Sequence, residues 1–198
     1  MSLVNAVDYS TEPLRILAID PGTNTMGMSF FELCLYTGRI TLVYGATYSA
    51  DRYANFEGCA ALALGDRLAK IQYHSANLSQ ILRQWRPHVI ASEAPYMGRF
   101  PQAYAALVQC CNAITLSVYD YDPSQNVWFV DPPTAKLAVG ALTRKGSKEN
   151  VQESILALSD LYLAEHFYLS QLDEHGYDSV AVGYWACKVL QPQVVPRP

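Results

Sequence analysis

Apolar residues in the first part of the chain form short, nearly continuous runs. Residues 14–20 are apolar almost up to the final Asp20, which is typical of a strand covered on both faces. The segment 26–48 predicts two further strands, joined by a hairpin turn at 36–39. A fourth strand is predicted over 87–92, just before Glu93, and a fifth over 126–131.

Helical spacing of apolar positions dominates the rest of the chain. Apolar residues recur every three or four positions, which indicates helices with one buried face. The predicted helices span 56–84, 102–119, 132–142, 151–167 and 177–190. Three strands followed by alternating helices and strands predict an α/β fold, a mixed sheet flanked by helices.

The length of 198 residues suits one domain. We expect a single domain over 14–190, an N-terminal extension over 1–13 and a flexible Pro-rich tail over 191–198. A hydrophobic share of 51% and a charged share of 16% indicate a packed core rather than disorder.

Charge and cysteine content restrict the function classes. The net charge of −4 argues against a protein that coats nucleic acid through its overall field, although a local basic patch remains compatible with it. The five cysteines are odd in number and have no C-x-x-C spacing, which favours reduced thiols. The sequence has no signal-peptide pattern and no apolar run of the ~20 residues that a membrane span needs. We therefore expect a cytoplasmic protein without membrane contact.

Acidic residues stand at the ends of several predicted elements. Asp20 and Glu93 each follow a predicted strand, at the position where α/β sheets collect functional groups. Near the last helix, Asp178 lies three residues after His175 and four after Glu174. If this helix begins early enough to include them, either spacing places the side chain on the face of Asp178.

Such acids have a chemical use if the fold brings them together. Mg²⁺ prefers oxygen ligands, and two ions about 4 Å apart can activate water for phosphodiester hydrolysis. Clustered carboxylates without cations repel one another, which raises their pKa values. Each acid alone is more often a turn former or a helix cap, and Asp20 before Pro21-Gly22 is a good turn signal. Only the combination favours a metal site.

Three segments together resemble the RuvC family of Holliday-junction resolvases, within the RNase H-like superfamily. They are "ILAIDPGTNTMG" around Asp20, "VIASEAPYMGRF" around Glu93 and "HGYDSVAVGYWA" around Asp178. The resemblance extends from about Leu14 to Leu190. It implies an RNase H-like mixed sheet in which three antiparallel strands are followed by parallel ones.

The resemblance also implies the site residues. Asp20, Glu93 and Asp178 would be catalytic, metal-binding carboxylates that hold two Mg²⁺ ions, with Mn²⁺ able to substitute. His175 matches a position occupied by Asp or His in the family, so it would be a metal ligand or a proton acceptor. Glu174 is the alternative fourth site residue.

A basic segment and an aromatic residue predict DNA contacts. The segment between Pro132 and Asn150 contains several lysines and arginines but only one acid. These basic side chains would contact DNA phosphates without reading the base sequence. In the family pattern, Tyr96 matches an aromatic that stacks on a base, and Arg99 would add a phosphate contact. The alternatives are that the basic segment is an ordinary solvated loop and that Tyr96 is a partly buried tyrosine without a role in binding. The basic residues are Lys136, Arg144, Lys145 and Lys148.

These features predict a metal-dependent endonuclease that cleaves branched DNA, above all four-way junctions. Symmetric cleavage implies a homodimer, with the helices 56–84 and 102–119 as possible interfaces. The acidic charge and the N-terminal extension would suit a diverged viral member. The alternatives are a debranching nuclease with broader substrates, a non-catalytic DNA-binding module, and an actin-like or sugar-kinase-like ATPase fragment suggested by "IDPGT". That last class needs a second lobe, for which 198 residues are too few.

Overall fold

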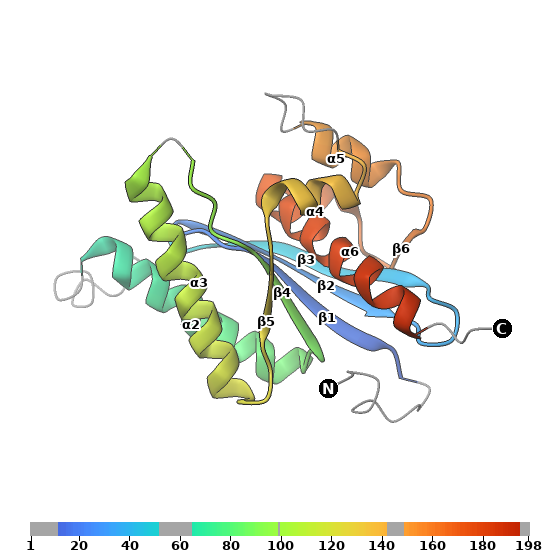
Figure 1. Ribbon diagram of the computed structural model, residues 1–198, viewed down its shortest axis with the longest axis horizontal. Helices are drawn as coiled ribbons and strands as arrows, with labels where there is room; N and C mark the ends of the chain where they lie inside the picture. Colours follow the sequence, from blue (N-terminus) through green and yellow to red (C-terminus); the bar gives the residue numbers. More distant parts are fainter. Residues whose placement is uncertain (1–11, 52–64, 99, 142–148, 195–198) are drawn as a thin grey trace.

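A computed structural model describes residues 12–51, 65–98, 100–141 and 149–194. Its centre is a six-stranded sheet with the order β5-β4-β1-β2-β3-β6 (Figure 1). The strands are β1 (Leu14–Asp20), β2 (Thr25–Leu33), β3 (Ile40–Ser49), β4 (Val89–Glu93), β5 (Val127–Val130) and β6 (Leu161–Leu163). β1, β2 and β3 are antiparallel neighbours, and β4, β5 and β6 join them in parallel. The predicted mixed α/β sheet is confirmed.

Helices cover both faces of this sheet. α2 and α3 lie on one face, and α6, with α4 and α5 beside it, lies on the other (Figure 1). The helical elements are α2 (Asp66–Trp85), α3 (Pro101–Tyr121), α4 (Pro132–Ala138), α5 (Glu149–Leu156), the 3₁₀ turn η2 (Leu169–Gln171) and α6 (Glu174–Val194).

The core is divided into two layers by the alternation of side chains along the strands. On β1, Ile16 and Ala18 belong to the apolar cluster under α6, whereas Leu17 and Ile19 belong to the cluster under α2 and α3. Because successive strand residues point to opposite faces, a strand covered on both sides must be apolar throughout. This explains the continuous apolar run that ends at Asp20.

Close contact between α6 and β2 depends on a glycine. A Cβ atom on Gly183 would lie 2.1 Å from Cε2 of Phe31, a distance that real Cβ contacts do not reach. Phe31 is fully buried at this contact. The absence of a side chain at Gly183 therefore lets α6 approach the sheet closely enough to cover its central strands.

The structure differs from the sequence prediction over 151–167. The predicted helix ends at Leu156, and β6 follows as an additional edge strand. Leu161 and Leu163 pair with β3, and the Arg39 guanidinium lies over the Tyr162 ring at 4.0 Å from its centre. These long-range contacts decide the conformation of a three-residue strand that is too short for periodicity to reveal.

The last helix is also longer than predicted. α6 begins at Glu174 and continues to Val194, past the predicted end at Leu190. Its final turns are held by Gln191, whose side-chain amide donates to the Gly38 carbonyl at 2.7 Å. This contact anchors the last turns of α6 to the turn between β2 and β3.

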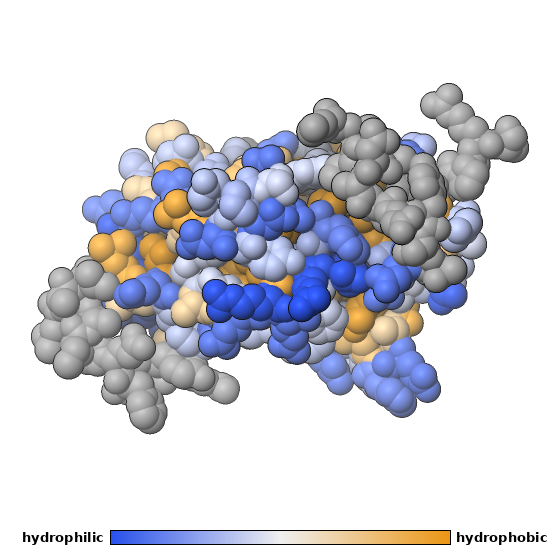
Figure 2. Space-filling view, turned by 90° about the horizontal axis from the view of Figure 1, so that it is seen from below, coloured by the Kyte–Doolittle hydropathy of each residue, from blue (hydrophilic) through white to orange (hydrophobic). Residues whose placement is uncertain are grey.

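The described residues can be compared with what the composition predicts about membrane spans, surface and cysteines. No helix in the described part of the chain is long and apolar enough to cross a membrane. Hydrophilic and hydrophobic residues alternate over the face shown in Figure 2, and no single hydrophobic surface covers it. Cys34, Cys110, Cys111 and Cys187 are free thiols, as expected, and Cys59 lies outside the described residues.

Candidate active site

Strand periodicity directs Asp20 and Glu93 to the same face of the sheet. Asp20 continues the alternation of Ile16 and Ala18 toward α6, and Glu93 continues that of Val89 and Ala91, which lie in the same cluster. β1 and β4 are parallel neighbours with Ile19 opposite Ser92, so the next residues, Asp20 and Glu93, end the two strands side by side. The two carboxylates therefore meet under the start of α6.

The start of α6 reaches this point because β2 carries a glycine there. Gly27 pairs with Asp20 across the β1–β2 ladder, and a Cβ atom on Gly27 would lie 2.0 Å from the His175 carbonyl oxygen. Any larger residue would therefore push the helix away from the strand. The close approach brings the His175 side chain to the ends of β1 and β2.

His175 connects these two strands through its ring. Its Nδ1 atom lies 2.8 Å from Oδ2 of Asp20, and its Nε2 atom lies 2.8 Å from Oγ1 of Thr25. A ring held at both nitrogens cannot rotate without breaking a hydrogen bond. Thr25 was not identified from the sequence, since a threonine that begins a strand carries no distinctive signal.

Asp173 fixes the start of α6 in a second way. Its carboxylate accepts a hydrogen bond from the Gly176 backbone N–H at 3.0 Å, which caps the helix, and another from the Thr47 hydroxyl of β3. Together with the Thr25 contact, this bond ties the first turn of α6 to two adjacent strands. Asp173 and Thr47 were also missed, because their pairing depends on the tertiary fold.

Lys136 faces Asp178 from the opposite side. α4 follows β5 directly and is capped by Asp131, which accepts from the Thr134 backbone N–H at 3.0 Å. This cap sets the position of Lys136 in the last turn of α4, with its Nζ atom 3.9 Å from Oδ1 of Asp178. Lys136 is thus the basic group next to the acids.

The electrostatics of the site are those of crowded carboxylates. Burial, with repulsion from Asp20 and Asp178, raises the pKa of Glu93 to about 8. Burial likewise raises the pKa of Asp178 to about 6, against the attraction of Lys136. The pKa of Asp20 is raised by burial, although its hydrogen bond with His175 opposes this, and the same bond raises the pKa of His175. The acids are close enough to influence one another.

The donor set fits a divalent cation, although the side chains are not arranged as a closed ligand shell. In the described part of the chain, no three His, Cys, Asp or Glu side chains are grouped so that they could hold a metal ion as they stand. Asp20 is directed at His175, and Asp178 at Lys136. Three carboxylates with raised pKa values are nevertheless the oxygen donors that Mg²⁺ prefers, and a cation would relieve their repulsion.

A cavity adjoins the acids between α4, α5 and the start of α6. Its volume is about 240 Å³, and Lys136 and Asp178 form part of its wall. Gln152 of α5 and Tyr177 of α6 also line it. The acids are therefore adjacent to a cavity, and Lys136 and Asp178 belong both to the site and to the cavity wall.

The residues predicted to contact DNA are only partly described. Tyr96 is 58% exposed in the segment between β4 and α3, close in sequence to Glu93. Lys136 lies beside the acids, close to Asp178. The other predicted residues, Arg99, Arg144, Lys145 and Lys148, lie outside the described residues.

The mixed sheet with α6 across its centre is the RNase H-like fold, as the sequence predicted. No protein-family model and no curated protein matches the sequence. The structure is similar to RuvC of Thermus thermophilus in complex with a Holliday junction substrate, at 16% identity over 92% of this chain and 99% of that one, with a TM-score of 0.64. It is also similar to the yeast mitochondrial Holliday junction resolvase Ydc2, at 13% identity over 97% and 84% of the two chains and a TM-score of 0.64. The fowlpox virus Holliday junction resolvase matches at 13% identity over 90% and 99%, with a TM-score of 0.50. The chain thus has the fold of these resolvases.

Proposed function

We propose that this protein is an endonuclease that cleaves four-way DNA junctions by metal-dependent hydrolysis of a phosphodiester bond. The observation that carries the proposal is the meeting of Asp20, Glu93 and Asp178 under the start of α6, in a chain with the fold of Holliday junction resolvases. A fold alone does not define an activity, so the site chemistry has to supply the argument.

The three carboxylates are the proposed ligands for two Mg²⁺ ions, which Mn²⁺ could replace. Bound there, the cations supply an activated water and neutralise charge on the phosphate. The structural support is the raised pKa of Glu93 and Asp178, because a site that strains its carboxylates in the absence of cations gains most from binding them.

His175 and Lys136 have the proposed roles of proton acceptor and phosphate contact. A cation that bound Asp20 would free Nδ1 of His175 from its hydrogen bond, and this nitrogen could then take a proton from the attacking water. Water attacks phosphorus, and one ester oxygen leaves as the P–O bond breaks. Lys136 lies at the border of the acids, where its ammonium group can contact the phosphate being cleaved.

Tyr96 and the basic residues near α4 are the proposed DNA contacts outside the metal site. Exposed aromatic rings stack on bases with little dependence on sequence, which suits recognition of a branched shape. Arg99, Arg144, Lys145 and Lys148 complete the proposal on sequence grounds. A homodimer follows from the need for two related sites on one junction, and free thiols favour action in the cytoplasm.

The test compares DNA shapes under identical conditions. The protein is incubated with a synthetic four-way junction, a flap and a linear duplex, in Mg²⁺ or Mn²⁺, and the products are separated on a gel. We expect the junction to be cut much faster than the duplex. Equal rates on junction and flap would indicate the broader debranching nuclease, and binding without cutting at any metal concentration would indicate a non-catalytic module.

A further inference from the structure

The turn between β1 and β2 carries both residues that hold His175. Asp20 ends β1 and Thr25 begins β2, and each contacts one nitrogen of the His175 ring at 2.8 Å. Only residues 21–24 separate them. Any displacement of this short turn must therefore move one or both partners of the histidine.

The opposite side of the turn is held by α2. His74 Nε2 lies 3.1 Å from the Thr23 carbonyl oxygen, and Lys70 Nζ lies 3.0 Å from Oδ1 of Asn24. Lys70 and His74 are four positions apart in the helix, so they share one face. Two consecutive residues of the turn are thus bound by two consecutive turns of α2.

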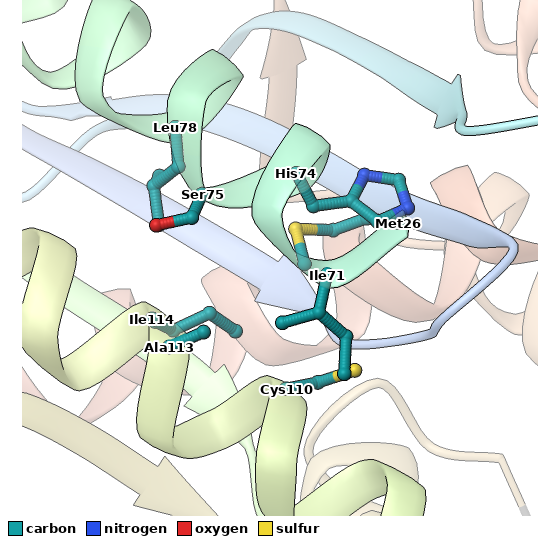
Figure 3. Close-up of a pocket in the computed structure, with 8 residues that line it drawn as sticks. All are labelled: Met26, Ile71, His74, Ser75, Leu78, Cys110, Ala113 and Ile114. Carbon is teal, nitrogen blue, oxygen red and sulfur yellow. The ribbon is translucent and has the colours of Figure 1, made fainter. Parts of the chain in front are cut away.

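His74 is unusual among the residues that surround it. Its side chain is only 2% exposed and lies beside Met26, and it lines one small pocket together with Cys110 and Ile114 of α3 (Figure 3). These neighbours leave no space for a water molecule. Burial lowers the pKa of His74, so the ring is neutral and has one N–H group.

The hydrogen bond with Thr23 decides where that proton is. A carbonyl oxygen can only accept, so Nε2 donates to it, and Nδ1 is left with no partner among the described residues. An unsatisfied buried polar atom destabilises the fold, and an apolar residue in this position would avoid that cost. The buried histidine is therefore unfavourable for packing alone, and what it contributes is its hydrogen bond to the Thr23 carbonyl of the turn.

We propose that His74 is a positioning residue of the candidate active site: by holding the Thr23 carbonyl, it fixes the β1–β2 turn and thereby the Asp20 and Thr25 contacts that orient His175. Lys70 supports the same turn through Asn24. The inference rests on the proposed function only for its effect on catalysis. Its effect on the His175 ring is independent of any activity.

Two substitutions separate the hydrogen bond from the volume of the side chain. His74→Gln can place an amide N–H near the position of Nε2 and keep the bond to Thr23, whereas His74→Leu fills the space and removes it. Leu78→Met is the control, because Leu78 lies one turn further along the same buried face of α2. Lys70→Met tests the neighbouring contact if His74→Leu does not fold.

The primary measurement is the nitrogen NMR spectrum of the histidine rings, taken without DNA or metal. The protein has four histidines, so labelling them gives a simple spectrum, and His175→Asn assigns the signals of His175. We expect the His175 nitrogen shifts to change in His74→Leu, to change less in Lys70→Met, and to match those of the native protein in His74→Gln and Leu78→Met. Native His175 shifts in both His74→Leu and Lys70→Met would overturn the proposal.

Cleavage kinetics give the second measurement. In His74→Leu we expect kcat on the four-way junction to fall by about 10-fold to 100-fold, the scale of a misplacement near 1 Å, with the junction Kd unchanged and with recovery in His74→Gln. A raised junction Kd that accounts for the whole loss of cleavage would contradict a positioning role. So would a cleavage rate that does not recover in His74→Gln. If the native protein cuts no DNA, the proposed function fails, and the NMR result still decides this inference.

Discussion

Nδ1 of His175 lies 2.8 Å from Oδ2 of Asp20, although 155 positions separate the two residues in the chain. The contact joins the first turn of α6 to the end of β1. The contact links the protonation states of the two side chains. The hydrogen bond raises the pKa of His175, while burial raises the pKa of Asp20. A cation that bound Asp20 would release the His175 ring, so the pair would couple metal binding to the proposed proton acceptor.

Asp20→Asn should separate cutting from binding. The amide keeps the size of the side chain but removes the negative charge that a cation needs. We expect cleavage of a four-way junction to fall by at least about 100-fold, since even outer partners of metal sites have effects of 10-fold to 100-fold. The junction Kd should change little, as measured by gel shift in Ca²⁺ or EDTA.

Asp160→Asn is the matched control for this substitution. Asp160 contacts Tyr184 and Lys188, away from the four clustered site residues, so its loss should leave cleavage intact. Native activity in Asp20→Asn would remove Asp20 from the metal site.

The stability of the metal-free protein should depend on the ionisation of Glu93. Its pKa is raised from 4.5 to about 8, so between these values the folded protein holds a proton that the unfolded chain has released. The free energy of unfolding therefore falls as the pH rises through this window, and Glu93 has no effect below it. His175 has the same direction, because its raised pKa stabilises the fold at low pH and this contribution is lost as pH rises.

Thermal unfolding in EDTA at pH 5 and pH 8.5 measures this effect. Glu93→Gln should raise the Tm at pH 8.5 and leave it almost unchanged at pH 5, with about 2–4 °C for each kcal/mol in a chain of this size. Mg²⁺ should raise the Tm of the native protein more at pH 8.5 than at pH 5, and this difference should shrink in Glu93→Gln. If Glu93→Gln changed the Tm equally at pH 5 and pH 8.5, the ionisation of a buried Glu93 would not explain the pH dependence.

Gly27→Ala should damage the site through the backbone. The new Cβ would lie 2.0 Å from the His175 carbonyl oxygen, so α6 must move away from β2. Overpacking of this kind costs about 1–3 kcal/mol, and here the displaced element carries His175. We expect a lower Tm and a loss of cleavage beyond what the lower stability explains.

Gly98→Ala is the control, because a Cβ there meets nothing within 4 Å. The comparison uses Tm and the cleavage rate at a temperature where both variants are folded. A Gly27→Ala protein with native Tm and rate would contradict the close approach of α6 to β2.

Residues that follow strand periodicity could be predicted from the sequence. Asp20 and Glu93 extend apolar runs whose alternation already determines the face on which they lie. The i, i+3 spacing of His175 and Asp178 places both on one side of a helix that includes them. Local rules therefore predicted that Asp20 and Glu93 stand at strand ends and that Asp178 lies in the last helix, whereas the helix predicted over 177–190 left His175 outside it.

Contacts that depend on tertiary packing could not be predicted. Thr25 and His74 look ordinary in sequence, and their partners lie far away in the chain. β6 was missed for a related reason, since its three residues were assigned to a helix and only the pairing with β3 makes them a strand. In each case, the deciding energy comes from a residue that no local pattern includes.

Lys136→Ala should weaken contact with phosphate while leaving DNA shape preference unchanged. Its Nζ atom borders the acids at 3.9 Å from Asp178, so it is suited to the phosphate that is cut. We expect slower cleavage and a salt dependence of binding reduced by about one phosphate contact. Lys188→Ala is the control, because Lys188 pairs with Asp160. A native rate and salt slope in Lys136→Ala would contradict the phosphate contact.

Tyr96→Ala should reduce the affinity for four-way junctions more than the affinity for duplex DNA. The ring is 58% exposed, and stacking on a base contributes about 1–3 kcal/mol, which corresponds to a junction Kd raised by roughly 5-fold to 150-fold. A junction with 2-aminopurine near its centre reports the contact, since its fluorescence changes when the base is unstacked from its neighbours. Tyr96→Phe should keep the native signal, because the stacking face is retained.

Tyr119→Ala is the matched control for the loss of an exposed ring. Tyr119 is also 58% exposed, and it lies near the far end of α3, a helix of 21 residues and hence about 30 Å long. A ring at that end should not reach a base beside the acids, so the junction Kd and the fluorescence should be native. If Tyr96→Ala and Tyr119→Ala behave alike, Tyr96 does not stack at the junction centre, and the structure-selective contact must lie elsewhere on the protein.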